Sequence, residues 1–335
     1  MLSTPRAAEV RASGTAAPLL EVQGLTVRFR TERKSLQALT DIGFSMAPGE
    51  ILGIVGESGS GKTQILLTMM GLLAENGRAF GSVKLHGEEV LNLPSDKLDR
   101  IRGSRMTMIF QDPMTSLNPY MRVGKQLTEV LVKHRGVGGS EAVRQAAAML
   151  EHVRIPEAQR RMGMYPHEFS GGMRQRAMIA MALLCKPALL LADEPTTALD
   201  VTVQAQILML MRDLARESGT SVVLVTHDLG VVADLCDRVI VLYGGRIMED
   251  GPIDDVFYNP KHPYTKGLLR SMPRLDEKTH GDLPTIPGQP PVLSLLSGGC
   301  PFEARCELRQ DHCKSVFPPL VRSGPRRLSC HEVSL

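Results

Sequence analysis

The sequence predicts an α/β fold in which short buried strands alternate with helices around a largely parallel sheet. Apolar runs at residues 51–55 and 188–192 have the length and composition of strands that are covered on both faces. Segments with helical periodicity lie between such runs, as at residues 201–216. A glycine-rich turn joins the 51–55 strand directly to a helix, an arrangement typical of α/β domains that bind phosphate.

The expected elements follow one another along the chain, beginning with an antiparallel β portion at the N-terminus. Strands are expected at residues 20–29, 36–46, 51–55, 83–90, 106–110, 188–192, 221–226 and 239–243, and the last two should close the sheet. Helices are expected at residues 64–73, in two pieces between 122 and 154 that are broken at 136–139, and at 171–184 and 201–216.

Composition sets limits on what this chain does. Its 335 residues exceed one typical domain, and 43% hydrophobic with 22% charged residues is ordinary for a protein with a core. A net charge of +3 without a block of five like charges gives no indication of nucleic-acid binding. No run approaches 18 apolar residues, so no membrane span is expected. Six cysteines without an export signal indicate reduced thiols.

Three parts are expected. Residues 1–19 are rich in Ala and Ser, lack an apolar core and are expected to be a disordered extension, not a signal peptide. Residues 20–255 form one domain with a helical insert at about 120–170. Residues 256–335 form a small cysteine-rich C-terminal extension, because prolines become frequent there and four cysteines lie after residue 299. There is no heptad array, which excludes ATPases with long coiled coils.

Residues 56–63, Gly-Glu-Ser-Gly-Ser-Gly-Lys-Thr, form a phosphate-binding loop between strand and helix. Its backbone N–H groups surround an anion, and the helix N-terminus adds about half a positive charge. Lys62 reaches the outer phosphates and the Thr63 hydroxyl is a ligand for Mg²⁺. A plain strand–helix turn is the alternative, and the complete pattern disfavours it. The predicted nucleotide ligands are Gly56, Glu57, Ser58, Gly59, Ser60, Gly61, Lys62 and Thr63.

Two carboxylates, Asp193 and Glu194, end the apolar strand 188–192. Ligands bind at the carboxyl edge of α/β sheets, so Asp193 is placed to hold Mg²⁺ and Glu194 to orient or deprotonate an attacking water. Two acids that merely end a strand are the alternative, which the upstream phosphate loop disfavours.

A second possible anion site begins at Ser170, a favourable N-cap followed by Gly171 and Gly172. One nucleotide does not need two such sites on one chain. Either the second site holds another ligand, or it serves a nucleotide on another subunit; a plain helix cap remains the third alternative.

Six segments resemble the ATP-binding subunit of ABC transporters in their order and spacing: the phosphate loop and residues 110–112, 170–172, 191–194, 198–200 and 225–228. The resemblance implies a P-loop ABC cassette that hydrolyses ATP as a head-to-tail dimer, with Ser170 and Gly172 on the γ-phosphate held by the partner. Asp200 would join the two sites. Phe29 would stack on adenine, although a strand phenylalanine is more often part of the core. Phe169 and Met173 differ from the commonest family residues, but neither change removes an anion-contacting group.

The resemblance also assigns catalytic roles. His227 would contact the γ-phosphate, and Gln111 would sense Mg²⁺ and link the ATP site to membrane subunits. Glu194 and Lys62 complete the predicted catalytic set, while Thr63, Gln111 and Asp193 would position Mg²⁺.

Residues 259–265, with their His-Pro-Tyr core, resemble the start of the C-terminal extension of oligopeptide and dipeptide importers, and residues 111–119 are similarly characteristic. The implied function is to power peptide import from the cytoplasmic face of the inner membrane, as a peripheral protein. The implied partners are a second, related ATP-binding subunit in a heterodimer, two transmembrane permeases and an extracytoplasmic peptide-binding protein, with no nucleic acid. Alternatives are nickel or antimicrobial peptides as cargo, or a soluble ABC ATPase acting on DNA or ribosomes.

Cys300, Cys306, Cys313 and Cys330 are separated by 5, 6 and 16 residues. Four thiolates hold either Zn²⁺ or an iron–sulfur cluster. Zinc sites favour cysteine pairs spaced by two to four residues, and their absence favours [4Fe–4S]. The importer resemblance implies the same cluster. Unligated cysteines in a small fold remain the alternative.

Overall fold

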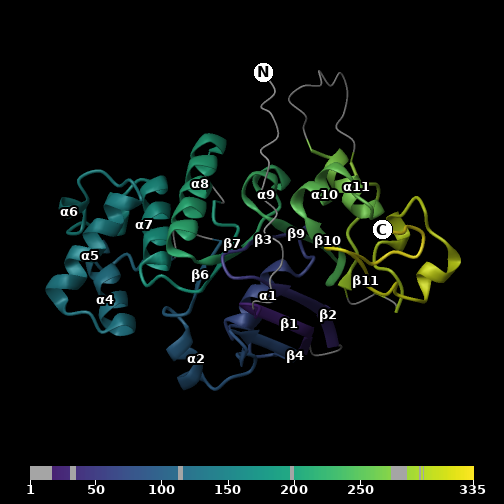
Figure 1. Cartoon of the computed structure of the whole chain (residues 1–335), viewed down its shortest axis with the longest axis horizontal. Helices are drawn as coiled ribbons and strands as arrows, with labels where there is room; N and C mark the ends of the chain where they lie inside the picture. The colour runs from purple at the N-terminus through teal and green to yellow at the C-terminus, as the bar shows by residue number, and fades with distance from the viewer. Residues whose placement is uncertain are drawn as a thin grey trace.

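A computed structural model describes residues 17–30, 35–111, 116–196, 200–272, 285–293, 296 and 298–335. Within them the chain forms two sheets and a group of helices at one side (Figure 1). This is the α/β arrangement with an N-terminal antiparallel portion that the sequence predicts.

The smaller sheet is antiparallel, with strand order β2–β1–β4–β5. Its strands are β1 (Leu20–Arg30), β2 (Ser35–Met46), β4 (Gly77–Leu85) and β5 (Glu88–Glu89). The expected single strand at 83–90 is wrong, because His86 and Gly87 adopt positive φ angles of 51° and 78° and turn the chain back between β4 and β5.

The larger sheet has the order β11–β12–β10–β9–β3–β8–β7–β6. Its strands are β3 (Ile51–Val55), β6 (Met106–Ile109), β7 (Leu189–Asp193), β8 (Ser221–Val225), β9 (Arg238–Tyr243), β10 (Arg246–Pro252), β11 (Val321–Ser323) and β12 (Arg326–Leu328). The pairs from β6 to β9 are parallel, so those strands end at one edge of the sheet. The sheet does not close at β9 as expected, since three antiparallel strands follow it.

The helices differ in length with their place in the fold. They are α1 (Lys62–Met69), α2 (Ser95–Ile101), α4 (Val123–Arg135), α5 (Gly139–His152), α6 (Ala158–Arg161), α7 (Gly171–Leu183), α8 (Val201–Ser218), α9 (Leu229–Leu235), α10 (Ile253–Tyr258) and α11 (Pro263–Arg270). Single 3-10 turns occupy Pro166–Glu168, Glu303–Arg305 and Asp311–Lys314.

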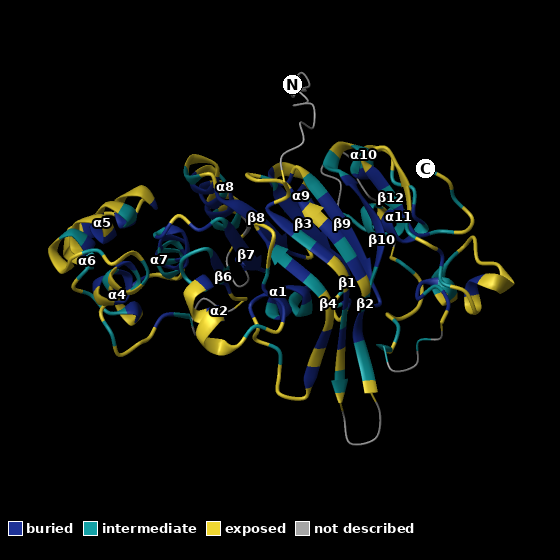
Figure 2. Cartoon of the chain, turned by 60° about the horizontal axis from the view of Figure 1, so that its bottom comes forward, coloured by how far each residue is buried: buried dark blue, intermediate teal, exposed yellow. Residues whose placement is uncertain are grey.

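Strand β3 shows how the large sheet is buried on both faces. Ile51 and Val55 belong to a core shared with α7, α8 and α9, whereas Leu52 and Ile54 face a second core under the antiparallel sheet and α1. This alternation is the two-residue period of a strand. The central strands are accordingly buried (Figure 2).

The helical lobe, formed by α4 to α7, lies at the end of the sheet beyond β6 (Figure 1). Helix α4 buries Val123, Leu127 and Leu131, four residues apart and therefore on one face. Gly136 ends α4 in the left-handed conformation, which explains the break expected at 136–139.

The C-terminal extension, residues 256–335, adds strands to the same large sheet. Strand β12 pairs with β10, with Asp250 opposite Arg327. The buried carboxylate of Glu249 accepts a hydrogen bond of 2.6 Å from Arg326. Asp250 is paired with both Arg327 and Arg238. The domain boundary near residue 255 stays a prediction, but the extension is joined to the α/β domain by strand pairing and buried charge.

The N-terminal expectation needs one correction. Residues 1–16 lie outside the described residues, but Leu19 is buried and its N–H donates to Met46 O at 2.8 Å. The ordered domain therefore begins before residue 20. Within the described part of the chain, we find no helix with the length and apolar character that a bilayer crossing needs.

Candidate active site

The phosphate loop, residues 56–63, is shaped by glycines that pack against backbone. Gly56 has a φ of 153°, and a Cβ there would lie 2.1 Å from Leu242 O. Gly61, the N-cap of α1, has a φ of 102°, and its Cβ would lie 2.9 Å from Ala38 O. Only glycine fits such close backbone approaches. The loop is thus held between β9 and β2, while Ser58 and Gly59 form its exposed tip.

Lys62 lies folded into this loop. It is 7% exposed, and its Nζ donates to Gly56 O at 2.7 Å and to Glu57 O at 3.1 Å. Burial lowers the pKa of Lys62, and the nearby carboxylates, chiefly that of Glu194, oppose this shift. The loop therefore contains a buried cation, the charge that an anionic phosphate group requires.

Thr63 and Asp193 bring two hard oxygen donors together. Thr63 Oγ1 donates to Asp193 Oδ1 at 3.2 Å, and Asp193 is 3% exposed at the end of β7. Burial raises the pKa of the Asp193 carboxyl, and the charge of Glu194 raises it further, against the hydrogen bond from Thr63. A hydroxyl and a buried carboxylate suit Mg²⁺, which prefers oxygen ligands and would compensate the buried charge.

Glu194 is the centre of a cluster in which three predicted residues converge. Its Oε2 accepts from Gln111 Nε2 at 3.1 Å, and its Oε1 lies 3.1 Å from His227 Nδ1. The three side chains come from just beyond the carboxyl ends of β6, β7 and β8. Parallel pairing places those ends at one edge, which explains the convergence.

The backbone at Glu194 is strained. Its φ is +44°, and its N–H donates to Val225 O at 2.9 Å. A left-handed conformation costs a residue with a side chain about 1–2 kcal/mol. Such strain persists where the surroundings fix it, commonly at functional sites.

The predicted second anion site lies at two neighbouring helix starts. Ser170 caps α7, its Oγ accepting from Met173 N–H at 3.3 Å, and Asp200 caps α8 through Val203 N–H at 2.9 Å. A Cβ on Gly172 would meet only Val203 Cγ1, at 3.5 Å. A single methyl group at Gly172 would therefore make only an ordinary van der Waals contact within this chain. Residues 112–115 and 197–199, part of two predicted motifs, lie outside the described residues.

Phe29 lies on β1, half-buried against the core between the two sheets. Its ring is next to Gly77, whose Cβ would lie 2.9 Å from Phe29 Cε1. The described contacts are those of a core residue, and stacking on adenine stays a prediction.

The four predicted cysteines, Cys300, Cys306, Cys313 and Cys330, line one small cavity together with Phe302 and His262. Burial, together with the three neighbouring thiols, raises the pKa of Cys300 to about 12, although a backbone hydrogen bond from Phe302 opposes the shift. Four sulfurs tetrahedral about a zinc ion, at about 2.3 Å from it, lie about 3.8 Å apart. Among the described residues the four thiols do not form a group with all sulfurs within 4.8 Å of one another.

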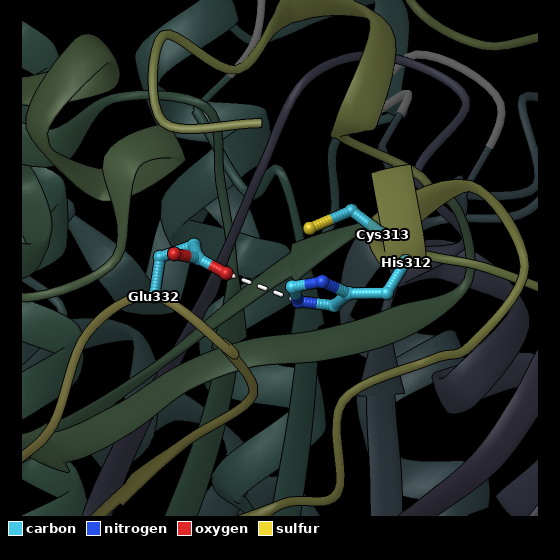
Figure 3. Close-up of side chains that lie close together, drawn as sticks. All are labelled: His312, Cys313 and Glu332. Atoms are coloured by element: carbon cyan, nitrogen blue, oxygen red, sulfur yellow. Dashed lines mark ion pairs between the residues drawn. The ribbon is translucent and has the colours of Figure 1, made fainter. Parts of the chain in front are cut away.

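Beside the cysteines lies a group of possible metal ligands that does meet this distance. His312, Cys313 and Glu332 have ligand atoms within 4.8 Å of one another (Figure 3). His312 Nε2 lies 3.0 Å from Glu332 Oε1, so these two potential ligands pair with each other. The sequence interpretation missed His312 and Glu332, because neither lies in a recognisable spacing with the cysteines.

Two further residues missed by the sequence interpretation contact the phosphate loop. Tyr264 and Arg305, both of the C-terminal extension, bond to Glu57. The His-Pro-Tyr segment marks Tyr264 as a residue to examine. No sequence pattern marks Arg305, since its ion pair with Glu57 spans 248 positions of sequence.

Strand, glycine loop, helix and strand-end carboxylates define a P-loop nucleoside triphosphatase. Residues 39–197 match the family model of the ABC transporter, and residues 248–313 that of the oligopeptide/dipeptide transporter C-terminal region. The chain is 57% identical to the oligopeptide transport ATP-binding protein OppD of Salmonella typhimurium, over 92% of each chain, and 56% identical to that of Escherichia coli, over 93% of this chain and 92% of the relative. It therefore belongs to the ABC transporter family of oligopeptide transport ATP-binding proteins.

A solved structure agrees with this assignment. The ATP-binding cassette MJ0796, in a dimeric post-hydrolysis state bound to ADP and Pi, is 30% identical with a TM-score of 0.62, covering 70% of this chain and 98% of that chain. The predicted family, cassette fold and ATPase activity are confirmed.

Proposed function

We propose that this ABC ATPase powers the import of oligopeptides through a membrane transporter. The observation that carries the enzymatic part is the Gln111–Glu194–His227 cluster beside the Thr63–Asp193 pair. The relatives named for oligopeptide transport support peptide cargo over nickel. A soluble ATPase acting on DNA or ribosomes would not need the matched C-terminal region of peptide transporters.

Each residue of the site has a distinct role in this proposal. The loop N–H groups and Lys62 hold the phosphates, and Thr63, Asp193 and Gln111 would hold Mg²⁺. Magnesium bound there supplies positive charge that offsets the charge of the transferred phosphoryl group. Glu194 orients the attacking water and accepts its proton.

His227 completes the reaction site. Because Nδ1 is directed at Glu194, Nε2 would be the nitrogen left to contact a γ-phosphate oxygen. Its ring is largely exposed, with 70% of the side-chain surface accessible, so a nucleotide or a second subunit would bury it.

We further propose that a second, related ATP-binding subunit supplies the other half of each site. Ser170, Gly171, Gly172 and Asp200 would face the nucleotide of that partner. The lack of a close contact at Gly172 supports this, because it leaves the start of α7 accessible to a ligand from outside the fold. ATP-dependent association of the purified subunits would test the arrangement. It should be lost in Ser170→Arg and kept in Ser140→Arg, at an exposed position of α5.

The transmembrane permeases would dock at a groove between α1 and the helical lobe. This groove, of about 700 Å³, is lined largely by apolar residues and includes Gln111. Its apolar lining includes Leu67, Met70, Met108, Phe110, Val130, Met178 and Met181. A permease helix seated there would touch Gln111 and so connect with Glu194. Docking would place this subunit at the cytoplasmic face of the inner membrane, with a peptide-binding protein on the other side.

The cysteine set would hold a [4Fe–4S] cluster. All four cysteines line one small cavity, and their spacing in the sequence lacks the close pairs that zinc sites favour, which supports a cluster over a lone zinc ion. The cluster would act as a structural crosslink between Cys300, Cys306, Cys313 and Cys330. Iron and sulfide analysis after anaerobic purification tests this, with Cys306→Ser against the buried control Cys236→Ser. Stoichiometric zinc without iron would contradict it.

Transport itself requires the assembled complex. In vesicles that contain the whole transporter, ATP should drive uptake of labelled oligopeptides, and Lys62→Ala in this chain should lower uptake at least tenfold. Uptake of nickel but not of peptide would overturn the cargo proposal. Undiminished peptide uptake in Lys62→Ala would overturn the ATP-coupled role.

A further inference from the structure

Glu57, the second residue of the phosphate loop, is bound by two side chains from outside the α/β domain. Its backbone N–H donates to Tyr264 OH at 2.9 Å. Its carboxylate accepts two bonds from Arg305, Nη1 to Oε2 at 2.7 Å and Nη2 to Oε1 at 3.1 Å. Both donors belong to the C-terminal extension. A bidentate pair of this kind fixes orientation as well as distance.

Arg305 is itself held at every donor. Besides the two bonds to Glu57, it donates to Tyr243 OH at 3.0 Å, Pro287 O at 2.8 Å and Ile286 O at 3.1 Å. These five bonds use all five N–H groups of a guanidinium. The side chain is 7% exposed, so this is a buried fixed contact and not a surface ion pair of small value.

Tyr264 is equally fixed. It is fully buried, and its ring packs on Tyr243, with centroids 4.4 Å apart, and on Phe302 at 5.3 Å. The imidazole Nδ1 of His262 accepts its backbone N–H at 3.0 Å. The Tyr264 hydroxyl therefore has one position available, against the loop.

The same short segment carries the cysteines. Arg305 immediately precedes Cys306, and Phe302 lies two residues after Cys300. Arg305 occupies the last position of the Glu303–Arg305 turn, and Cys306 caps that turn. The cysteine cavity is thus separated from Glu57 by only one backbone step and one ion pair.

We propose that Arg305 and Tyr264 are positioning residues that hold the phosphate loop ready for nucleotide, and that they convey the state of the cysteine site to it. A loop fixed in its binding conformation loses less freedom when it binds ligand, so its affinity is higher. The first part rests on the ATPase activity and the second on the proposed cysteine site.

Nucleotide affinity of the full-length chain tests the first part. With a fluorescent ATP analogue and Mg²⁺, Arg305→Ala should raise Kd about tenfold. Arg305→Lys should give an intermediate Kd, because lysine keeps the positive charge but lacks the paired N–H groups of the guanidinium. Arg309→Ala, exposed four residues away, is the matched control and should bind like wild type.

Two more variants guard against a general folding defect. Tyr264→Phe keeps the packed ring and removes only the hydroxyl, so a rise in Kd of about threefold is expected with an unchanged melting temperature. Glu57→Gln and Arg305→Ala should be non-additive when combined, since they break one contact. Additive effects, or Arg305→Ala and Tyr264→Phe both within twofold of the control, would overturn the inference.

The second part has its own readout. Cys306→Ser should raise Kd in the wild-type background and have little further effect in Arg305→Ala. Metal content is measured on the same samples, so a failure of the metal proposal is distinguished from a failure of the contact. Equal effects of Cys306→Ser in both backgrounds would overturn the link.

Discussion

The phosphate site and the C-terminal extension hold their reactive groups in different ways. Around the phosphate site, Gln111, Glu194 and His227 each follow a buried parallel strand by one or two residues, and the sheet positions them. The extension has strands of three residues and single 3-10 turns. Buried ion pairs fasten it, as between Arg326 and Glu249. The sheet alone positions the reactive groups of the first region, whereas the extension relies on buried ion pairs in addition to its short strand pairing.

The largest effect is expected from a substitution in the phosphate loop, where backbone atoms pack closely. Gly56→Ala would place a Cβ 2.1 Å from Leu242 O and should abolish nucleotide binding, because strand β9 cannot move away. Gly59→Ala, with a φ of 78° and open space around it, should cost only about 1–2 kcal/mol of stability. Nucleotide titration and thermal unfolding of both variants would check this. Equal binding by the two would contradict it.

A second prediction tests the role of charge. Arg326→Ala removes the cationic partner of the fully buried Glu249 carboxylate and leaves it only the backbone N–H groups of Lys261 and His262 as donors. The buried charge is then no longer neutralised, and the protein should lose about 3–5 kcal/mol of stability. Arg322→Ala, on the exposed neighbouring strand β11, should change stability by less than about 0.5 kcal/mol. Chemical denaturation with a probe on the extension measures both. Similar losses of stability in Arg326→Ala and Arg322→Ala would contradict the role given to buried charge in the extension.

The smallest effect is expected in the helical lobe. Gly136→Ala introduces a side chain at a φ of 62°, with no neighbour within 4 Å, and should cost about 1–2 kcal/mol. Gly138→Ala, which caps α5 at a φ of −62°, should be neutral or slightly stabilising. Neither should alter nucleotide affinity. Denaturation midpoints and ATP-analogue binding would be measured together. A loss of affinity in Gly136→Ala would contradict this prediction, because it would couple the helical lobe to the nucleotide site.

Sequence reasoning succeeded where function depends on local order. The phosphate loop, the strand-end acids and the break at Gly136 are each encoded within about ten residues. The structure brings the predicted residues Gln111, Glu194 and His227 together, and their roles in hydrolysis stay predictions. It failed at β10, because the buried Glu249 and Asp250 interrupt the apolar pattern of a strand, and at β11 and β12, because strands of three residues carry little periodicity.

Contacts between distant segments were also beyond sequence reasoning. The bonds from Tyr264 and Arg305 to Glu57 depend on how the extension folds back on β9, which no local pattern records. The turn at His86 and Gly87 was missed although Gly87 was a signal for it, since glycine favours a positive φ; the αL histidine itself gave no signal.

The most direct test of the account is the behaviour of Glu194→Gln in the assembled transporter. The amide keeps the hydrogen-bonding shape beside Gln111 and His227 but cannot accept the proton of water. We predict unchanged Kd for ATP with a loss of turnover of at least about 100-fold. Near-normal hydrolysis by this variant would contradict the central role assigned to Glu194.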